Sequence, residues 1–161
     1  MTVKNRVSLW FDGAISEAAR FYCDTFPDTQ RDSTETAPAD NPSVKEGEEL
    51  SIMMTIMGIP TLLLNGGPHF PQTEAFSFMV GTEDQAETDR LWEAIVENGG
   101  SKGQCGWCKD RWGISWQIVP RALSDALADS DPDAARRSMQ AMLTMKKIDI
   151  AAIEAARKGT N

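Results

Sequence analysis

Histidine is almost absent from this chain of 161 residues, which contains a single one, His69. One histidine without an obvious carboxylate partner cannot make the usual metal site. Cysteine is also scarce, with three residues, an odd number. The segment Met1–Arg6 lacks the apolar core of a signal peptide. We therefore expect reduced thiols and a cytoplasmic protein.

A basic surface is missing as well. Lysine and arginine number 16 against 24 aspartates and glutamates, which gives a formal charge of −8. Because phosphate binding depends on an excess of lysine and arginine, we expect neither a nucleic acid nor a membrane as partner. The most apolar stretch, Leu50–Leu64, is broken by Gly58 and Pro60 and is too short to span a bilayer. The composition is that of one globular domain, residues 1–161.

The first half of the chain predicts a strand, a helix and then more strands. A β-rich segment, Val7–Phe11, precedes apolar residues that recur at helical spacing from Ile15 to Phe26. A short strand, a polar loop and a hairpin are expected next, at residues 29–35, 37–49 and 50–65.

The second half repeats this order after a connector rich in glycine and proline, residues 66–71. A strand is predicted at Ala75–Val80. The spacing of Thr82–Gln85 is typical of a capping box and predicts the start of a helix, whose buried residues should be Leu91, Trp92, Ile95 and Val96. Two further strands are expected near Cys105–Lys109 and Ser115–Val119.

The tail after Pro120 is predicted to be helical. Asp131 before Pro132 indicates one helix start, and Asp149 indicates another, with Ile150 and Ile153 facing inward. Between them, helical spacing relates Ala135, Met139, Met142 and Leu143. We interpret these residues as core, with a surface for a second copy of the chain as the alternative.

Two amides stand near the ends of predicted strands, where carboxylates would permit other chemistry. Alternation places Asn65 opposite the Leu62/Leu64 face of its strand, and Gln117 opposite the Trp116/Ile118 face. A glutamate there could bind a metal or move a proton. Asparagine and glutamine can only donate and accept hydrogen bonds.

Other candidate residues leave alternatives open. His69 either packs over a site entrance or acts as a general base or hydrogen-bond donor. Cys105 and Cys108 form a C-x-x-C; we interpret them as structural thiols, with a redox or metal role as the alternative. Trp92 and Trp116 are expected in the core, whereas Trp107 and Trp112 fit a core or a pocket lining equally well.

Several motifs together resemble the PhnB-like branch of the vicinal oxygen chelate superfamily, which contains glyoxalase I, fosfomycin-resistance enzymes and extradiol dioxygenases. The resemblance covers nearly the whole chain. Its motifs are Leu9–Gly13 with Glu17–Tyr22, Leu64–Phe70, Gln104–Trp107 with Lys109–Pro120, and Met139–Leu143 with Lys146–Asp149.

The resemblance implies an α+β fold of two βαβββ modules that form a curved mixed β-sheet around a central cleft, usually in a homodimer. We place the first module at residues 1–66, a connector at 67–74, the second module at 75–120 and a helical tail at 121–161. The superfamily's metal ligands would fall near Val7 or Leu9, at Asn65, near Ala75 or Ser77, and at Gln117. Because these side chains are poor metal ligands, we expect no tightly bound metal and no cofactor.

The resulting hypothesis is a metal-free cleft that binds a small apolar or aromatic molecule. The residues expected to bind it are Leu9, Phe11, Asn65, His69, Phe70, Ser77, Trp107, Trp112 and Gln117. The alternative is a metal-dependent lyase, isomerase or resistance enzyme of the glyoxalase type. Many relatives are called 3-demethylubiquinone-9 3-methyltransferase. Methyl transfer is the weakest reading here, because Gly66-Gly67-Pro68 is followed by Pro71 and predicts no helix for a nucleotide cofactor.

Overall fold

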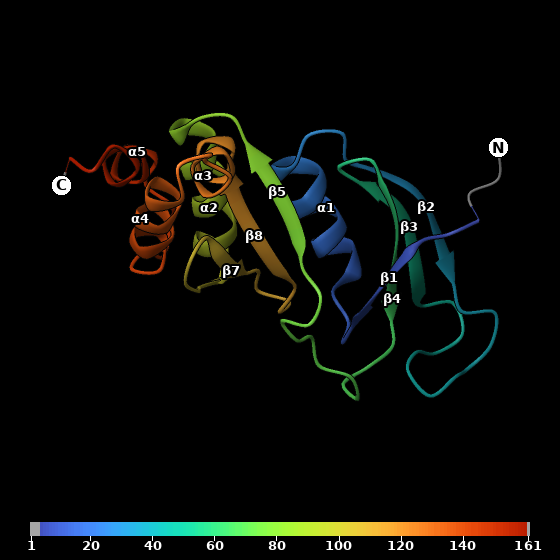
Figure 1. Ribbon diagram of the computed structural model, residues 1–161. Coiled ribbons are helices and arrows are strands. Elements are labelled where there is room, and N and C mark those ends of the chain that lie inside the picture. Colours follow the sequence, from blue (N-terminus) through green and yellow to red (C-terminus); the bar gives the residue numbers. More distant parts are fainter. Residues whose placement is uncertain (1–3, 161) are drawn as a thin grey trace. The chain divides into compact units, whose positions relative to one another are not determined.

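The computed structural model describes residues 4–160, which divide into two compact units with the boundary between Gln72 and Thr73. Each unit contains one four-stranded sheet with its own helix (Figure 1). The expected α+β class and the repetition of strand, helix and strands in the two halves are confirmed.

The first unit consists of β1 (Val7–Phe11), α1 (Ile15–Thr25), β2 (Gln30–Thr36), β3 (Glu49–Ile56) and β4 (Ile59–Asn65). The sheet order is β1-β4-β3-β2; β1 runs parallel to β4, and the other pairs are antiparallel. The apolar residues of α1 pack against β2, β3 and β4 and are buried, as their helical spacing predicts.

The second unit repeats this arrangement with β5 (Phe78–Thr82), α2 (Gln85–Glu97), β6 (Ser101–Lys102), β7 (Trp107–Lys109) and β8 (Ser115–Pro120). Its sheet order is β5-β8-β7-β6, with β5 parallel to β8. The helix α2 lies against this sheet and buries Leu91, Trp92 and Ile95.

Two boundaries in the second unit differ from the prediction. β5 begins at Phe78 instead of Ala75, because pairing with β8 starts at Phe78 and the preceding residues form a turn. The N-cap of α2 is Asp84 instead of Thr82; its carboxylate accepts a hydrogen bond from the backbone N–H of Glu87 at 2.8 Å. The two-residue strand β6 was not expected.

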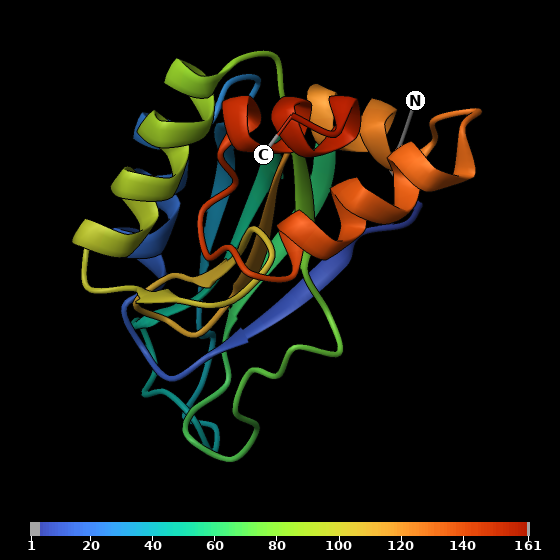
Figure 2. The same ribbon diagram turned by 60° about the vertical axis from the view of Figure 1, so that its left-hand side comes forward.

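The tail forms three helices that pack on one another, α3 (Arg121–Leu127), α4 (Pro132–Met142) and α5 (Ile150–Lys158), shown in orange to red in Figure 2. The predicted N-caps are confirmed, since the carboxylates of Asp131 and Asp149 accept backbone hydrogen bonds at the starts of α4 and α5. A buried cluster joins α3 to α5 and is formed by Leu123, Ala126, Ile148 and Ile153; Ala141 and Met142 of α4 pack against it.

The predicted buried stripe of α4 is wrong for two of its four residues. Met139 is 42% exposed and Leu143 is 59% exposed, whereas Ala134 and Ser138 are buried. Small residues occupy the buried side where α4 packs on α5, and Arg137 reaches across to donate hydrogen bonds to the carbonyls of Ala156 and Arg157. Met139 and Leu143 therefore lie on the surface, whereas Met142 packs against the buried cluster of the tail.

No helix within residues 4–160 is long and apolar enough to cross a membrane.

Candidate functional site

The second sheet has one face packed against α2 and one face turned away from it, which we call the open face. Phe78, Trp116 and Ile118 are buried on the α2 side. Alternation places Trp107, Lys109, Ser115, Gln117 and Met79 on the open face. The expected core position of Trp116 is confirmed, and so is the alternation that separates Gln117 from Trp116 and Ile118.

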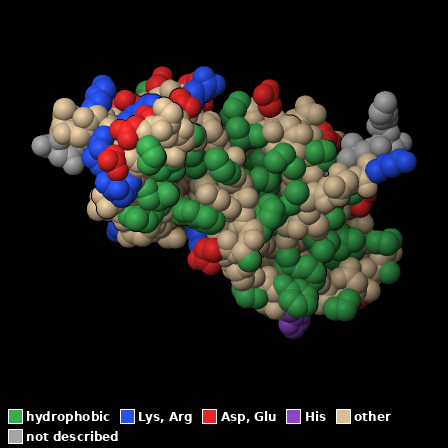
Figure 3. Space-filling model, viewed as in Figure 1, with side chains coloured by type: hydrophobic (Ala, Val, Ile, Leu, Met, Phe, Trp, Pro, Cys, Tyr) green, Lys and Arg blue, Asp and Glu red, His purple; other side chains and the backbone are tan. Residues whose placement is uncertain are grey.

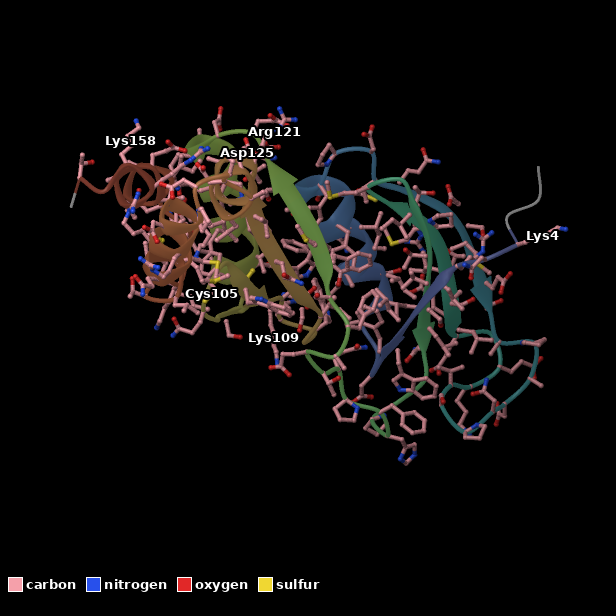
Figure 4. The ribbon with its side chains drawn as sticks, viewed as in Figure 1. Lys4, Cys105, Lys109, Arg121, Asp125 and Lys158 are labelled. Carbon is pink, nitrogen blue, oxygen red and sulfur yellow. The ribbon has the colours of Figure 1, made fainter. Side chains whose placement is uncertain are left out.

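A cavity of about 520 Å³ lies at this face and at the adjoining sheet edge, a volume typical of small-molecule sites. All of its lining residues belong to the second unit: Glu74, Ser101, Lys102, Gly103, Gln104, Cys105, Trp107, Cys108, Lys109 and Ser115. Figure 4 shows Cys105 and Lys109 at the β7 end of the unit, whereas Arg121 and Asp125 lie on α3 at the other end.

The hydroxyl of Ser115 has an unusual position in this cavity. The residue is 2% exposed, and its Oγ is the one buried side-chain oxygen or nitrogen within residues 4–160 that lacks a hydrogen-bond partner. Leaving a buried hydroxyl unpaired costs about 1–3 kcal/mol. Ser115 lines the cavity, and its Oγ is almost completely covered in the free protein, so a bound molecule would supply the missing partner after a small movement of the neighbouring atoms.

A lysine and a glutamate form an ion pair at the same cavity. The Nζ of Lys109 lies 2.5 Å from a carboxylate oxygen of Glu74. The hydrogen bond from Lys109 lowers the pKa of the Glu74 carboxyl below its usual range. Glu74 belongs to the irregular segment before β5, whereas Lys109 is fixed on β7.

A tight turn between β6 and β7 forms one wall of the cavity, and the tail holds this turn in place. The N–H groups of Cys105 and Gly106 donate to the carbonyls of Met145 and Lys146 at 2.8 and 2.7 Å. Gly106 has a φ of 83°, and a Cβ there would lie 2.7 Å from the carbonyl oxygen of Ile118. Glycine is therefore required at this close approach.

Three of the sequence-predicted residues meet on the open face. The amide nitrogen of Gln117 donates a hydrogen bond of 2.8 Å to the hydroxyl of Ser77. Trp107 is the direct neighbour of Gln117 in the β7–β8 ladder and lines the cavity. Of the two readings left open for Trp107, the structure favours a pocket lining.

The residues predicted on the first sheet lie elsewhere. Leu9 and Phe11 are each 3% exposed and belong to the core on the α1 side of the sheet. Asn65 pairs with Phe11 across β1 and β4 and lies on that side too. Its oxygen accepts from the N–H of Gly13 at 3.0 Å, and its nitrogen donates to the carbonyl of Glu49 at 3.1 Å. Asn65 and Gln117 are therefore not equivalent, and we leave Leu9, Phe11 and Asn65 out of the site.

The remaining predicted residues lie in loops. His69 and Phe70 are exposed in the connector, where the ring of Phe70 meets that of Trp10 edge-on at 4.8 Å. Figure 3 shows the histidine, in purple, beside hydrophobic side chains of the first unit. Trp112 lies in the turn between β7 and β8, with the guanidinium of Arg111 4.7 Å from its ring centre. None of the three lines the cavity described above.

The two cysteines of the C-x-x-C have different surroundings. Cys108 is 2% exposed, and burial raises the pKa of its thiol to about 12. Cys105 is half-buried in the turn, with a φ of 56°, and lines the cavity. Both are free thiols. A redox dithiol needs a thiol with a lowered pKa at a helix N-terminus, and Cys108, on a strand, provides the opposite.

The chemistry of the donors argues against a divalent metal at the superfamily positions. These positions hold an apolar side chain, an amide or a hydroxyl, and the amides of Asn65 and Gln117 already donate to other protein groups. Within residues 4–160, no three histidine, cysteine, aspartate or glutamate side chains converge as metal ligands would. The side chains at these positions are therefore unsuitable ligands for a divalent metal ion.

Sequence reasoning missed Glu74, Lys109, Ser115 and Cys105 as cavity residues. A signal was present for two of them. Ser115 lies two residues before Gln117, and Lys109 lies two residues after Trp107, so alternation puts each pair on one face. The position of Glu74 depends on an irregular segment that no periodicity describes.

Two βαβββ units with mixed four-stranded sheets are the architecture of the vicinal oxygen chelate superfamily, and this chain is one of its PhnB-like members. Residues 3–119 match the model of the family described as 3-demethylubiquinone-9 3-methyltransferase, and the chain belongs to that family. The three tail helices lie outside the matched range.

Solved structures agree with this assignment. A putative 3-demethylubiquinone-9 3-methyltransferase, PhnB protein, from Bacillus cereus is 25% identical, with a TM-score of 0.64, over 73% of this chain and 99% of its own. The fosfomycin resistance protein FosX from Listeria monocytogenes shares the fold at 12% identity and a TM-score of 0.56, over 79% of this chain and 98% of its own. FosX from Mesorhizobium loti gives 13% identity and a TM-score of 0.55, over 80% and 99%. No curated protein matches the chain.

Proposed function

We propose that this protein binds a small molecule in the cavity at the open face of the second sheet. The observation that supports the proposal is the hydroxyl of Ser115, buried without a partner in the wall of a 520 Å³ cavity. Folding retains such a group at a cost of about 1–3 kcal/mol, and a ligand that accepts its hydrogen bond recovers that cost.

The lining suits a partly apolar ligand. Trp107 offers a large aromatic surface, which small-molecule sites use for apolar or planar groups. Ser115 and Lys109 supply polar contacts that would orient the molecule. Ser77 and Gln117 extend the same face beyond the cavity and bind each other through side chains. The central cleft between modules, expected from the resemblance, stays a prediction on which this proposal does not depend.

Enzymatic alternatives have less support from these residues. Methyl transfer is not part of the proposal, because Gly66 and Gly67 lead into a turn and the irregular residues up to Ser77, with no helix to hold a nucleotide cofactor. A metal-dependent reaction of the glyoxalase or fosfomycin-resistance type would need donors that the superfamily positions lack in this chain. The family match therefore supports the fold, and the proposed binding function rests on the cavity.

We also propose, as the resemblance implies, that the protein is a homodimer in a reducing compartment such as the cytoplasm. The exposed Met139 of α4 and Leu143, the residue that follows α4, support a protein contact, and the three free thiols support the compartment. Light scattering on the eluting protein measures the mass directly. A species near 17.7 kDa at micromolar concentration would contradict the dimer.

A fragment screen by ligand-observed NMR tests the binding function. We expect small aromatic compounds to bind the wild-type protein and to lose at least tenfold in affinity in Trp107→Ala. Trp112→Ala is the matched control, because it removes the same ring from the same unit outside the cavity. Equal affinity in the wild type and both variants, or no binding to the wild type, would contradict the proposal.

A further inference from the structure

Resting on the proposed function, the geometry points to a ligand class: we infer that the cavity takes a planar apolar molecule bearing an anionic oxygen, such as an aromatic carboxylate or phenolate. In this inference the anionic group replaces the Glu74 carboxylate on Lys109. Three independent features of the cavity lead to it.

The first feature is a pair of adjacent hydrogen-bond donors. Lys109 and Ser115 are direct partners in the antiparallel β7–β8 ladder, and both line the cavity. Directly paired residues have Cβ atoms about 5 Å apart. Because the long lysine side chain is flexible, its ammonium can lie close enough to the neighbouring hydroxyl for both groups to donate to the two oxygens of one carboxylate. The hydroxyl has no protein partner, so this arrangement is incomplete without a ligand.

The second feature is the local charge. The charged residues that line the cavity are two lysines, Lys102 and Lys109, and one glutamate, Glu74. The chain as a whole has a formal charge of −8. An excess of positive charge at this cavity, in a protein that is acidic as a whole, favours the binding of an anion and disfavours that of a cation.

The third feature is that the anion now on Lys109 is replaceable. The Glu74 side chain is 65% exposed, whereas that of Lys109 is 34% exposed. An ion pair with so exposed a partner is screened by solvent and contributes little to stability. Glu74 also lies in the irregular segment before β5, so it can move away without breaking a strand. We interpret its carboxylate as an internal substitute for the ligand's anionic group.

The position of Trp107 sets the size of the ligand's apolar part. Trp107 precedes Lys109 by two residues on β7, so the two side chains lie on one face about 7 Å apart. That separation matches the length of one aromatic ring with its carboxylate. The volume of 520 Å³ leaves room for a fused ring pair.

Isothermal titration with three naphthalene probes of the same shape tests the inference. We expect 1-naphthoate to bind at least tenfold more tightly than naphthalene-1-methanol, and naphthalene-1-methylamine to bind most weakly. Lys109→Met should reduce naphthoate affinity at least tenfold and leave the alcohol unchanged, and Lys109→Arg should restore part of the loss.

Glu74→Gln gives the sharper result, because the loss of a carboxylate is expected to improve binding. Removing the internal competitor should raise naphthoate affinity at least threefold, with no change for the alcohol. Glu83→Gln is the matched control; Glu83 pairs with Arg121 on the surface of the same unit, and both side chains are about two-thirds exposed. Figure 4 shows Arg121 at the end of the unit away from Lys109.

The titration results can contradict the anionic ligand class without contradicting the proposed binding site. If the alcohol and the amine bind as well as naphthoate, the anion class is wrong and the cavity remains a binding site. If Glu74→Gln weakens naphthoate binding, the competitor role of Glu74 is wrong. If none of the three probes binds the wild type, both the inference and the proposed function fail.

Discussion

Lys109 and Ser115 face each other across the β7–β8 ladder, yet only the lysine has a partner for its polar side chain. Lys109 holds Glu74, an exposed residue from an irregular segment. Ser115 is buried with its hydroxyl unpaired at the wall of the cavity. A fold that retains such a group in the free protein loses stability that a ligand can restore. This asymmetry is the physical basis of the proposed binding site.

The role of Asn65 can be tested in the first unit. Asn65→Asp keeps the acceptor for the N–H of Gly13 but loses the donor to the carbonyl of Glu49. We expect the free energy of unfolding to fall by about 1–3 kcal/mol, measured by urea denaturation. Ligand affinity should not change, because Asn65 does not line the cavity of the second unit.

Asn41→Asp is the control for that substitution. The amide of Asn41 accepts from the N–H groups of Ser43 and Val44, and a carboxylate keeps both bonds. We expect a change within about 0.5 kcal/mol. Equal destabilisation by the two substitutions would show that the hydrogen bond to Glu49 has no particular importance.

The buried thiol of Cys108 predicts a loss of stability at alkaline pH. Its pKa is about 12 in the folded protein against an ordinary value of 9.0. Below pH 9 the thiol is protonated in both states and contributes nothing to the pH dependence. Between pH 9 and 12 the unfolded chain releases a proton that the folded chain keeps, so the free energy of unfolding falls as pH rises. The total loss is up to about 4 kcal/mol.

Unfolding titrations at several alkaline pH values measure this loss. Cys108→Ala should remove it, and Cys105→Ala, the other cysteine of the C-x-x-C, should retain it. Parallel pH profiles for the wild type and Cys108→Ala would contradict the assignment. A thiol-reactive reagent should likewise leave Cys108 unmodified until the protein unfolds.

The hydrogen bonds that attach the tail to α2 give a third prediction. The amide of Gln85 donates to the carbonyl of Ile148 at 3.1 Å and accepts from the N–H of Ile150 at 2.8 Å. Gln85→Met removes both bonds at similar volume. We expect faster hydrogen exchange at the tail amides, and also at Cys105 and Gly106, whose N–H groups bind tail carbonyls.

The control for the tail is Gln140→Met, at an exposed position of α4. It should leave exchange at Cys105 and Gly106 unchanged. If Gln85→Met leaves those two amides equally protected, then the tail does not hold the turn that forms the cavity wall.

Much of the fold follows from local pattern. The spacing of apolar residues in α1, the proline after Asp131 and the alternation around Gln117 each predict the observed structure. The α4 stripe fails because the small residues Ala134 and Ser138 take the buried side of the helix, and Met139 lies outside it. Helical spacing alone cannot distinguish that side from the one with Met139.

The candidate site was less predictable, because it depends on contacts between distant segments. Asn65 is bound by Gly13 and Glu49, far away in the sequence, so its hydrogen bonds could not be foreseen from its own strand. The pairing of Lys109 with Ser115 is set by the length of the β7–β8 turn. Glu74 reaches Lys109 from a segment without periodicity.

The most direct test of the proposed site is Ser115→Ala, measured for stability and for binding in the same preparation. Removing an unpaired buried hydroxyl should raise the free energy of unfolding by about 1 kcal/mol. The same change should weaken 1-naphthoate and naphthalene-1-methanol about tenfold, the loss of one hydrogen bond worth about 1.4 kcal/mol. Ser130→Ala, at an exposed serine of the same unit outside the cavity, should change neither quantity. A variant that is less stable than the wild type and binds both probes equally well would contradict the account.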